Sequence, residues 1–384
     1  MHNTTALRTT VRVITIALAA QIALSWPLWH TAGGRTFPEL PLPGFQFYPA
    51  PALEGIQTGL LLLALLATAL FPQKTWFRGG LACLVLWLVA RDLNRLQPWT
   101  YFYLAAFGLL FAAGNDARTG KRYLQWLVAA VYAWGGFNKI TPYFAIDNFP
   151  WFCEAFKWTK YFGAFPAAGY AVAAGEMLLG PGLLWEKTRR VFRWLTVLFH
   201  LFIALALSPL GLDWNTVVIP WNFAMAGMVW VLFRKNPESG TDTCRQNGLV
   251  RTALATTLLA LAWVLPALNI FHHWDEALSW KMYSNTQTEA SFYSKNGAPC
   301  AQVAEVWRQF SYDHGTKMLF DDWAMADIHV PAYNSRRAHL QLARYLCACQ
   351  ESPGQPAGLL LVEVDRWNRS AEREVAIPCT GWPR

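Results

Sequence analysis

The chain reads LEGIQTGLLLLALLATALF from residue 53 to residue 71. A helix needs about 20 mostly apolar residues to cross the hydrocarbon core of a bilayer, so this stretch predicts a transmembrane span. Similar apolar segments can be drawn at residues 11–29, 79–97, 101–115, 123–144, 166–185, 191–211, 217–233 and 250–271. The sequence therefore predicts an all-α polytopic membrane helix bundle of about nine spans, over residues 1–272.

The composition supports a membrane as part of the solvent. Hydrophobic residues make up 54% of the 384 residues and charged residues only 15%, which is more apolar surface than one soluble core of this length buries. The formal net charge is +8, but the basic residues lie in short clusters between apolar segments. We therefore expect membrane lipids as partners, through their anionic headgroups, and no nucleic acid.

Lysine and arginine gather in alternate loops. Because positively charged loops tend to stay in the cytoplasm, we expect a multi-pass protein of the cell membrane with a cytoplasmic N-terminus. The first apolar run continues through Trp26 and Leu28, which favours a retained signal anchor over a cleaved signal peptide. The residues on the basic side are Arg8, Arg12, Lys74, Arg78, Arg118, Lys121, Arg122, Lys187, Arg189, Arg190, Arg234, Lys235 and Arg245.

From about residue 273 the composition becomes mixed polar and charged, which predicts a separate domain over residues 273–384. Residues 336–347 have apolar positions at helical spacing, and residues 359–364 read as a buried strand. We expect a small α+β domain. An odd number of spans places this domain outside the cytoplasm.

Four of the seven cysteines lie in this domain, at Cys300, Cys347, Cys349 and Cys379. An extracytoplasmic compartment permits disulfides, so we expect at least one bridge within this set, with the pairing left open. Free or redox-active thiols are the alternative. The C-x-C spacing is not the C-x-x-C redox motif, and no clustered histidines complete a zinc pattern, so no metal site is predicted.

The sequence also places ionisable residues in or near apolar segments. Lys139 follows Gly135 and Gly136 at the outer end of a segment. Adjacent glycines let another backbone or a ligand approach closely, and an amine in a poorly hydrated pocket is a candidate base. The alternative is a lysine that extends to the headgroups. Glu176 lies near the middle of another segment and His200 within a third; each is either a proton partner or a structural hydrogen-bonding group.

We expect Lys139, Glu176 and His200 to converge on one cavity, because a shared polar pocket costs less than three isolated buried ionisable groups. They are the candidate catalytic residues. The candidate substrate-binding residues offer amide hydrogen bonds, flat aromatic walls or, for the arginine, a planar donor fork. They are Asn138, Arg91, Trp214, Asn215, Trp221 and Asn222.

The stretch Gly135-Gly136-Phe137-Asn138-Lys139-Ile140 resembles a motif of the vitamin K-dependent gamma-carboxylase-like group, also called the horizontally transferred transmembrane (HTTM) domain. The Glu176 span, the Phe199-His200 span before Gly211 and a soluble domain after the membrane part are also similar to that group. The resemblance implies that Lys139 acts as a base in a carboxylase-like lyase or a quinone-linked oxidoreductase. DoxX-like membrane proteins are similar in their Gly motifs and intramembrane glutamate.

Three functions remain open on the residues alone. The first is a membrane enzyme acting on a lipid or a lipid-soluble, quinone-like small molecule, with a quinone-like cofactor as the candidate. The second is a non-enzymatic membrane scaffold that displays the C-terminal domain, since no complete catalytic set is visible in the sequence. The third, a transporter, has less support, because no inverted repeat is found.

Overall fold

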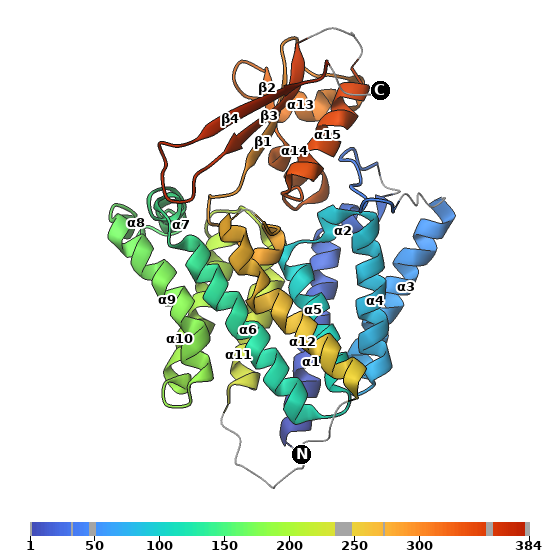
Figure 1. Ribbon diagram of the computed structural model, residues 1–384, viewed down its shortest axis with the longest axis vertical. Helices are drawn as coiled ribbons and strands as arrows, with labels where there is room; N and C mark the ends of the chain where they lie inside the picture. Colours follow the sequence, from blue (N-terminus) through green and yellow to red (C-terminus); the bar gives the residue numbers. More distant parts are fainter. Residues whose placement is uncertain are drawn as a thin grey trace. The chain divides into compact units, whose positions relative to one another are not determined.

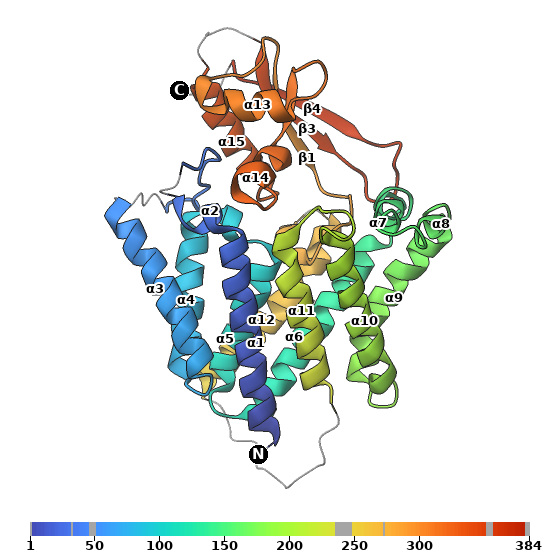
Figure 2. The same cartoon turned by 180° about the vertical axis from the view of Figure 1, so that it is seen from behind.

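The computed structural model describes residues 2–31, 34–45, 51–234, 248–271, 273–350 and 356–380, and most of them are helical (Figures 1 and 2). The chain divides into two compact units. The first comprises Met1–Leu24, Ile56–Trp87 and Pro98–Ser284, and the second comprises Ser25–Gly55, Leu88–Gln97 and Asn285–Arg384. The loop with Lys235 and Arg245, which entered the topology prediction, lies outside the described residues.

Each of the nine predicted apolar segments overlaps a long helix. These helices are α1 (His2–Leu24), α3 (Pro51–Leu70), α4 (Thr75–Arg91), α5 (Pro98–Ala113), α6 (Ala117–Lys139), α9 (Pro166–Leu184), α10 (Arg189–Leu207), α11 (Ile219–Leu232) and α12 (Leu249–Trp263). Within the described residues, five stretches are helical, long and apolar enough to cross a membrane: Thr4–Leu24, Leu53–Leu70, Pro166–Leu184, Arg189–Leu207 and Leu249–Phe271. Pro98–Ala113 and Thr216–Leu232 are apolar but shorter.

Local sequence explains where the helices around the later site begin and end. The Asp116 carboxylate accepts hydrogen bonds from the backbone N–H groups of Arg118 and Thr119, which caps the start of α6. Pro166 stands at the start of α9, where its missing N–H costs nothing. Helices α9 and α10 run antiparallel in both views, and α9 packs along α6.

Short elements connect α6 to α9. They are a π-helical turn at Phe144–Asn148 (η3), α7 (Phe149–Cys153) and α8 (Lys160–Gly163). Phe144, Phe149 and Cys153 pack with Ala173 of α9 in a buried cluster. The aromatic loop between two predicted spans is therefore a packed part of the first unit.

The second unit contains a four-stranded antiparallel sheet of order β2-β1-β3-β4. Helices α14 and α15 pack against it, and Ser335 caps α15 by accepting a hydrogen bond from the backbone N–H of Ala338. The expected helix and strand at residues 336–347 and 359–364 are confirmed, as is a small C-terminal α+β fold. The elements are β1 (Glu289–Ser294), α13 (Ala304–Phe310), β2 (Lys317–Leu319), α14 (Phe320–Ile328), α15 (Arg336–Ala348), β3 (Ala357–Glu363) and β4 (Arg373–Pro378).

Two earlier stretches of the chain belong to this second unit, which the sequence alone does not indicate. The Asp327 carboxylate accepts hydrogen bonds from the backbone N–H groups of Thr36 and Phe37, at 2.9 and 2.6 Å. The backbone N–H of Tyr333 donates to Asn94 Oδ1 at 3.2 Å. Residues 25–55, which include α2 (Trp26–Trp29), and residues 88–97 are thus built into the same fold as the C-terminal residues.

Two cysteine pairs lie at disulfide distance in the second unit. Cys300 pairs with Cys349, with Cα atoms 5.6 Å apart, and Cys347 pairs with Cys379, with Cα atoms 5.5 Å apart. The expected disulfide bonding within this set is confirmed, and the structure supplies the pairing.

Candidate functional site

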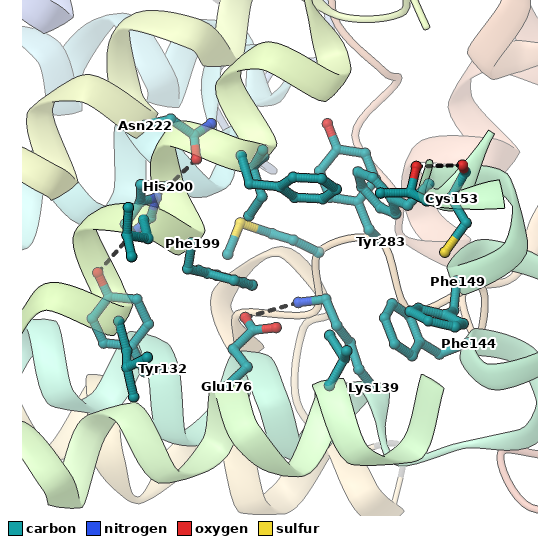
Figure 3. A pocket seen from close by; sticks show the side chains of 18 of the residues that line it. Tyr132, Lys139, Phe144, Phe149, Cys153, Glu176, Phe199, His200, Asn222 and Tyr283 are labelled. Carbon is teal, nitrogen blue, oxygen red and sulfur yellow. Dashed lines mark hydrogen bonds and ion pairs between the residues drawn. The ribbon is translucent and has the colours of Figure 1, made fainter. Parts of the chain in front are cut away.

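A cavity of about 470 Å³ lies inside the first unit (Figure 3). Its walls come from α6, α9, α10 and α11, from the short elements between α6 and α9, and from Met282 and Tyr283. The three predicted catalytic residues, Lys139, Glu176 and His200, all line it. Its volume is in the range of pockets that bind small molecules.

Lys139 and Glu176 form an ion pair on the cavity wall. Lys139 Nζ lies 2.9 Å from Glu176 Oε1 and 3.3 Å from the carbonyl oxygen of Gly135, and both side chains are buried. Lys139 is the last residue of α6, where the negative end of the helix dipole favours a cation. The structure thus opposes the interpretation in which Lys139 extends to the headgroups.

The glycines before Lys139 allow this pair to form. A Cβ atom at Gly136 would lie 2.6 Å from the Cα atom of Met177, so only glycine lets α6 and α9 approach this closely. A Cβ atom at Gly135 would lie 2.9 Å from Glu176 Oε1. The prediction that these glycines permit close approach of another backbone is confirmed, and the approach brings Glu176 within reach of Lys139.

His200 belongs to a hydrogen-bonded chain from α6 through α10 to α11. Its Nε2 lies 2.6 Å from the Tyr132 hydroxyl and its Nδ1 lies 2.8 Å from Asn222 Oδ1. Asn222 Nδ2 donates to the carbonyl oxygen of Val218, so Oδ1 is the acceptor, His200 Nδ1–H is the donor and the Tyr132 hydroxyl donates to Nε2. Both ring nitrogens of His200 therefore have a hydrogen-bond partner.

The remaining wall is mainly apolar and rich in aromatic rings. Phe144, Phe149 and Phe152 line the cavity, and the Tyr283 ring lies 5.4 Å from that of Phe152. The Asn148 amide donates to the carbonyl oxygen of Tyr283 at 2.6 Å, which ties residues 282–283 to the η3 turn. An apolar ligand would therefore meet flat rings with one ion pair among them.

The predicted binding residues divide into two groups. Trp221 and Asn222 line the cavity, and the buried indole N–H of Trp221 has no hydrogen-bond partner among the described residues. The other four are not among the lining residues of this cavity. Asn138 donates to the carbonyl oxygen of Ser279 at 2.7 Å, and Trp214 is exposed. Asn215 is buried, and its side chain is hydrogen-bonded to that of Tyr283, which lines the cavity. Arg91 pairs with Glu39 in the second unit.

Several lining residues were not predicted. Tyr132 lies seven residues before Lys139, so both fall on the same face of α6, and this spacing was a usable signal. The density of Phe residues between residues 143 and 165 was a second signal. No sequence signal indicated Cys153 and Tyr283 as lining residues, because their positions depend on the folding of irregular segments.

Comparison with protein-family models, curated proteins and solved structures finds no match for this chain. Within the described residues, no group of three or more His, Cys, Asp and Glu side chains lies close enough to hold a metal ion. The functional argument therefore rests on the cavity and its charged pair.

Proposed function

We propose that this chain is an integral membrane enzyme that binds a lipid-soluble, quinone-like molecule in its reduced, quinol form in the cavity of the first unit and removes a proton from a hydroxyl group of that quinol. The observation that carries the proposal is the Lys139–Glu176 ion pair, buried on the wall of an otherwise mainly apolar cavity. A buried pair is costly to build and contributes little net stability, so its place on a cavity wall favours a functional role.

The proposed step is a proton transfer that uses both members of the pair. A proton passes from Lys139 Nζ to Glu176 Oε1, which leaves a neutral amine and a carboxylic acid. The O–H bond of the ligand then breaks as an N–H bond forms on Lys139. The ligand oxyanion is left beside the Lys139 ammonium, and the net result is one proton moved from the ligand to Glu176. The low polarity of the walls reduces the cost of the neutral pair and strengthens the attraction between oxyanion and ammonium.

We also propose a membrane topology and a family for the protein. We propose nine spans, a cytoplasmic N-terminus and an extracytoplasmic second unit, on the basis of the alternating basic loops. We propose kinship with the gamma-carboxylase-like group, and Lys139, at the position that the motif assigns to the base, lines the cavity.

Binding of a short-chain benzoquinol and of its dimethyl ether tests the proposed site. The two probes share their ring, but only the quinol has hydroxyl groups. Equilibrium dialysis with the full-length protein in detergent, under anaerobic conditions, measures both dissociation constants. We expect the quinol to bind at least about tenfold more tightly, because hydrogen bonds to charged groups contribute about 1.5–3 kcal/mol.

A matched pair of double variants locates the effect. Lys139→Met/Glu176→Gln removes both charges of the cavity pair, and we expect it to bind the two probes equally. Lys281→Met/Glu276→Gln removes a second ion pair of the first unit, 3.0 Å between Nζ and Oε1, whose members do not line the cavity. This control should keep the quinol preference. A preference that survives in the cavity variant would make the Lys139–Glu176 pair structural and favour the scaffold hypothesis.

Mass spectrometry of an organic extract of the purified protein identifies the natural ligand. We expect an apolar molecule with an ionisable hydroxyl group in the wild type and a reduced amount in the cavity variant. An extract holding only bulk phospholipid in both proteins would contradict the quinone-like assignment.

A further inference from the structure

A second cavity, of about 490 Å³, lies in the first unit at the N-terminal ends of α1, α4 and α6. The turn that joins α3 to α4 and residues Gly114 and Asn115 complete its wall. All of its lining residues belong to the first unit, and none of them lines the cavity with Lys139.

All the charged side chains that line this second cavity are positive. Arg8, Lys74 and Arg78 line it, and no described lining residue is an aspartate or glutamate. The nearest acid along the chain is Asp116, whose carboxylate oxygens accept hydrogen bonds from the Thr119 hydroxyl and the α6 backbone. Three cations without a lining carboxylate fit an anionic ligand.

Arg78 shows that the site is built into the fold. Its side chain is 2% exposed, and its Nη2 donates to the carbonyl oxygen of Gly114 at 3.0 Å. Its buried Nε has no hydrogen-bond partner among the described residues. A buried guanidinium with an unsatisfied donor is costly unless an acceptor of opposite charge comes to it.

The start of α4 adds to the positive potential. This helix of 17 residues begins at Thr75, which lines the cavity. The first N–H groups of a helix have no partners within it, and with the helix dipole they favour phosphate and other anions. Thr75 and Arg78 therefore present backbone and side-chain donors from the first turn of the same helix.

Apolar surface adjoins this polar cavity and identifies the kind of anion. Trp76 lines the cavity and is 80% exposed. Phe77, which follows it, and Leu70 and Phe71 at the end of α3 are also exposed. Such a surface can bind acyl chains, whereas a soluble phosphate would make no contact with it. We propose that this cavity binds the phosphate headgroup of an anionic membrane lipid, with the acyl chains on the apolar surface of α3 and α4.

Lipid binding in mixed micelles tests this proposal. The full-length protein in detergent is titrated with headgroup-labelled phosphatidylglycerol or with phosphatidylcholine of the same acyl chains. We expect phosphatidylglycerol to bind more tightly. Arg8→Gln and Lys74→Gln should each weaken its binding about fivefold, since a basic residue contributes about 1 kcal/mol to attraction of anionic lipid. Both side chains are exposed, so these variants keep the core intact.

Arg118→Gln is the matched control. It removes one exposed positive charge from the same basic side but does not line the cavity, and it should leave phosphatidylglycerol binding unchanged. Equal binding of the two lipids, or equal weakening by all three variants, would overturn the proposal. Displacement of the lipid by inorganic phosphate, beyond that by chloride at the same ionic strength, would also overturn it and would identify a soluble phosphate as the occupant.

Discussion

His200 and His339 are both buried, but their polar surroundings differ. The Nδ1 and Nε2 atoms of His200 each have a hydrogen-bond partner, whereas the Nδ1 atom of His339 has none in the described residues. The ring of His339, in α15, lies 6.2 Å from that of Phe320. Burial without a partner for Nδ1 disfavours the charged imidazolium and lowers the pKa of His339 to about 4.

This lowered pKa predicts acid sensitivity of the second unit. The pKa of this histidine is about 6.5 in the unfolded chain and lower in the folded protein, so below about pH 6.5 the unfolded chain takes up a proton that the folded protein does not. The stability present above about pH 6.5 is therefore lost as the pH falls from about 6.5 to about 4. We expect the free energy of unfolding to drop by about 2 kcal/mol between about pH 7.5 and pH 5. Thermal unfolding followed by near-ultraviolet circular dichroism at both pH values measures the drop.

His339→Leu should remove most of this pH dependence, because the buried site then no longer takes up a proton. His314→Asn is the control, since His314 is an exposed histidine of the same unit. An unchanged pH dependence in His339→Leu would show that other groups cause the acid sensitivity.

Two helices, α6 and α9, determine the geometry of the candidate site. Their contact brings together residues that lie 37 positions apart in the chain, Lys139 and Glu176. The contact depends on glycine at Gly136, where a side chain would meet the backbone of α9. Packing between elements therefore decides whether the ion pair forms.

Gly136→Ala should separate α6 from α9. We expect a loss of about 1–3 kcal/mol in the free energy of unfolding, the usual cost of overpacking, together with a loss of quinol preference. Gly175→Ala is the matched control, because nothing lies within 4 Å of a Cβ atom there. Chemical unfolding in detergent should show Gly175→Ala to be neutral or slightly stabilised. Equal effects of the two substitutions would contradict a close-approach role for Gly136.

The end of α15 is held from two sides by the disulfide pairs. Cys347 connects it to the residue after β4, and Cys349 connects it to Cys300 at the start of a short helical turn. We expect Cys347→Ser/Cys379→Ser to destabilise the second unit by about 2–4 kcal/mol, as is typical for a disulfide.

Alkylation with and without reduction tests the pairing. The native protein should leave Cys300, Cys347, Cys349 and Cys379 unmodified, and the reduced, denatured protein should be alkylated at all four, which serves as the control. Peptide mapping should recover the two crosslinked peptides. Four freely alkylated thiols in the unreduced protein would exclude both bridges.

At the scale of the whole molecule, the alternating basic loops predict how the chain crosses the membrane. A reporter fused after residue 280 should be active outside the cytoplasm and one fused after Lys235 inside, because positively charged loops are retained there. Alkaline phosphatase, which is active outside the cytoplasm, and green fluorescent protein, which reports the cytoplasm, are each fused at both points. Reversed activities would contradict the predicted orientation. The same activity at both points would show that the chain does not cross the membrane between them.

Local patterns were sufficient to predict the helices, the α+β character of the C-terminal residues and the set of paired cysteines. Apolar segments of spanning length, the helical spacing at residues 336–347 and the strand at residues 359–364 each depend on neighbouring residues. The glycines before Lys139 also indicated a close approach. These features follow from backbone geometry and apolar periodicity, which a short stretch of sequence already contains.

Contacts across long sequence separations were decided only by the tertiary structure. Glu176, rather than His200, is the partner of Lys139, and Tyr132 and Asn222 saturate His200. The cysteine pairing and the addition of residues 25–55 and 88–97 to the second unit have the same origin. Which of several chemically equivalent partners a side chain meets depends on how helices pack, and packing is a property of the whole chain.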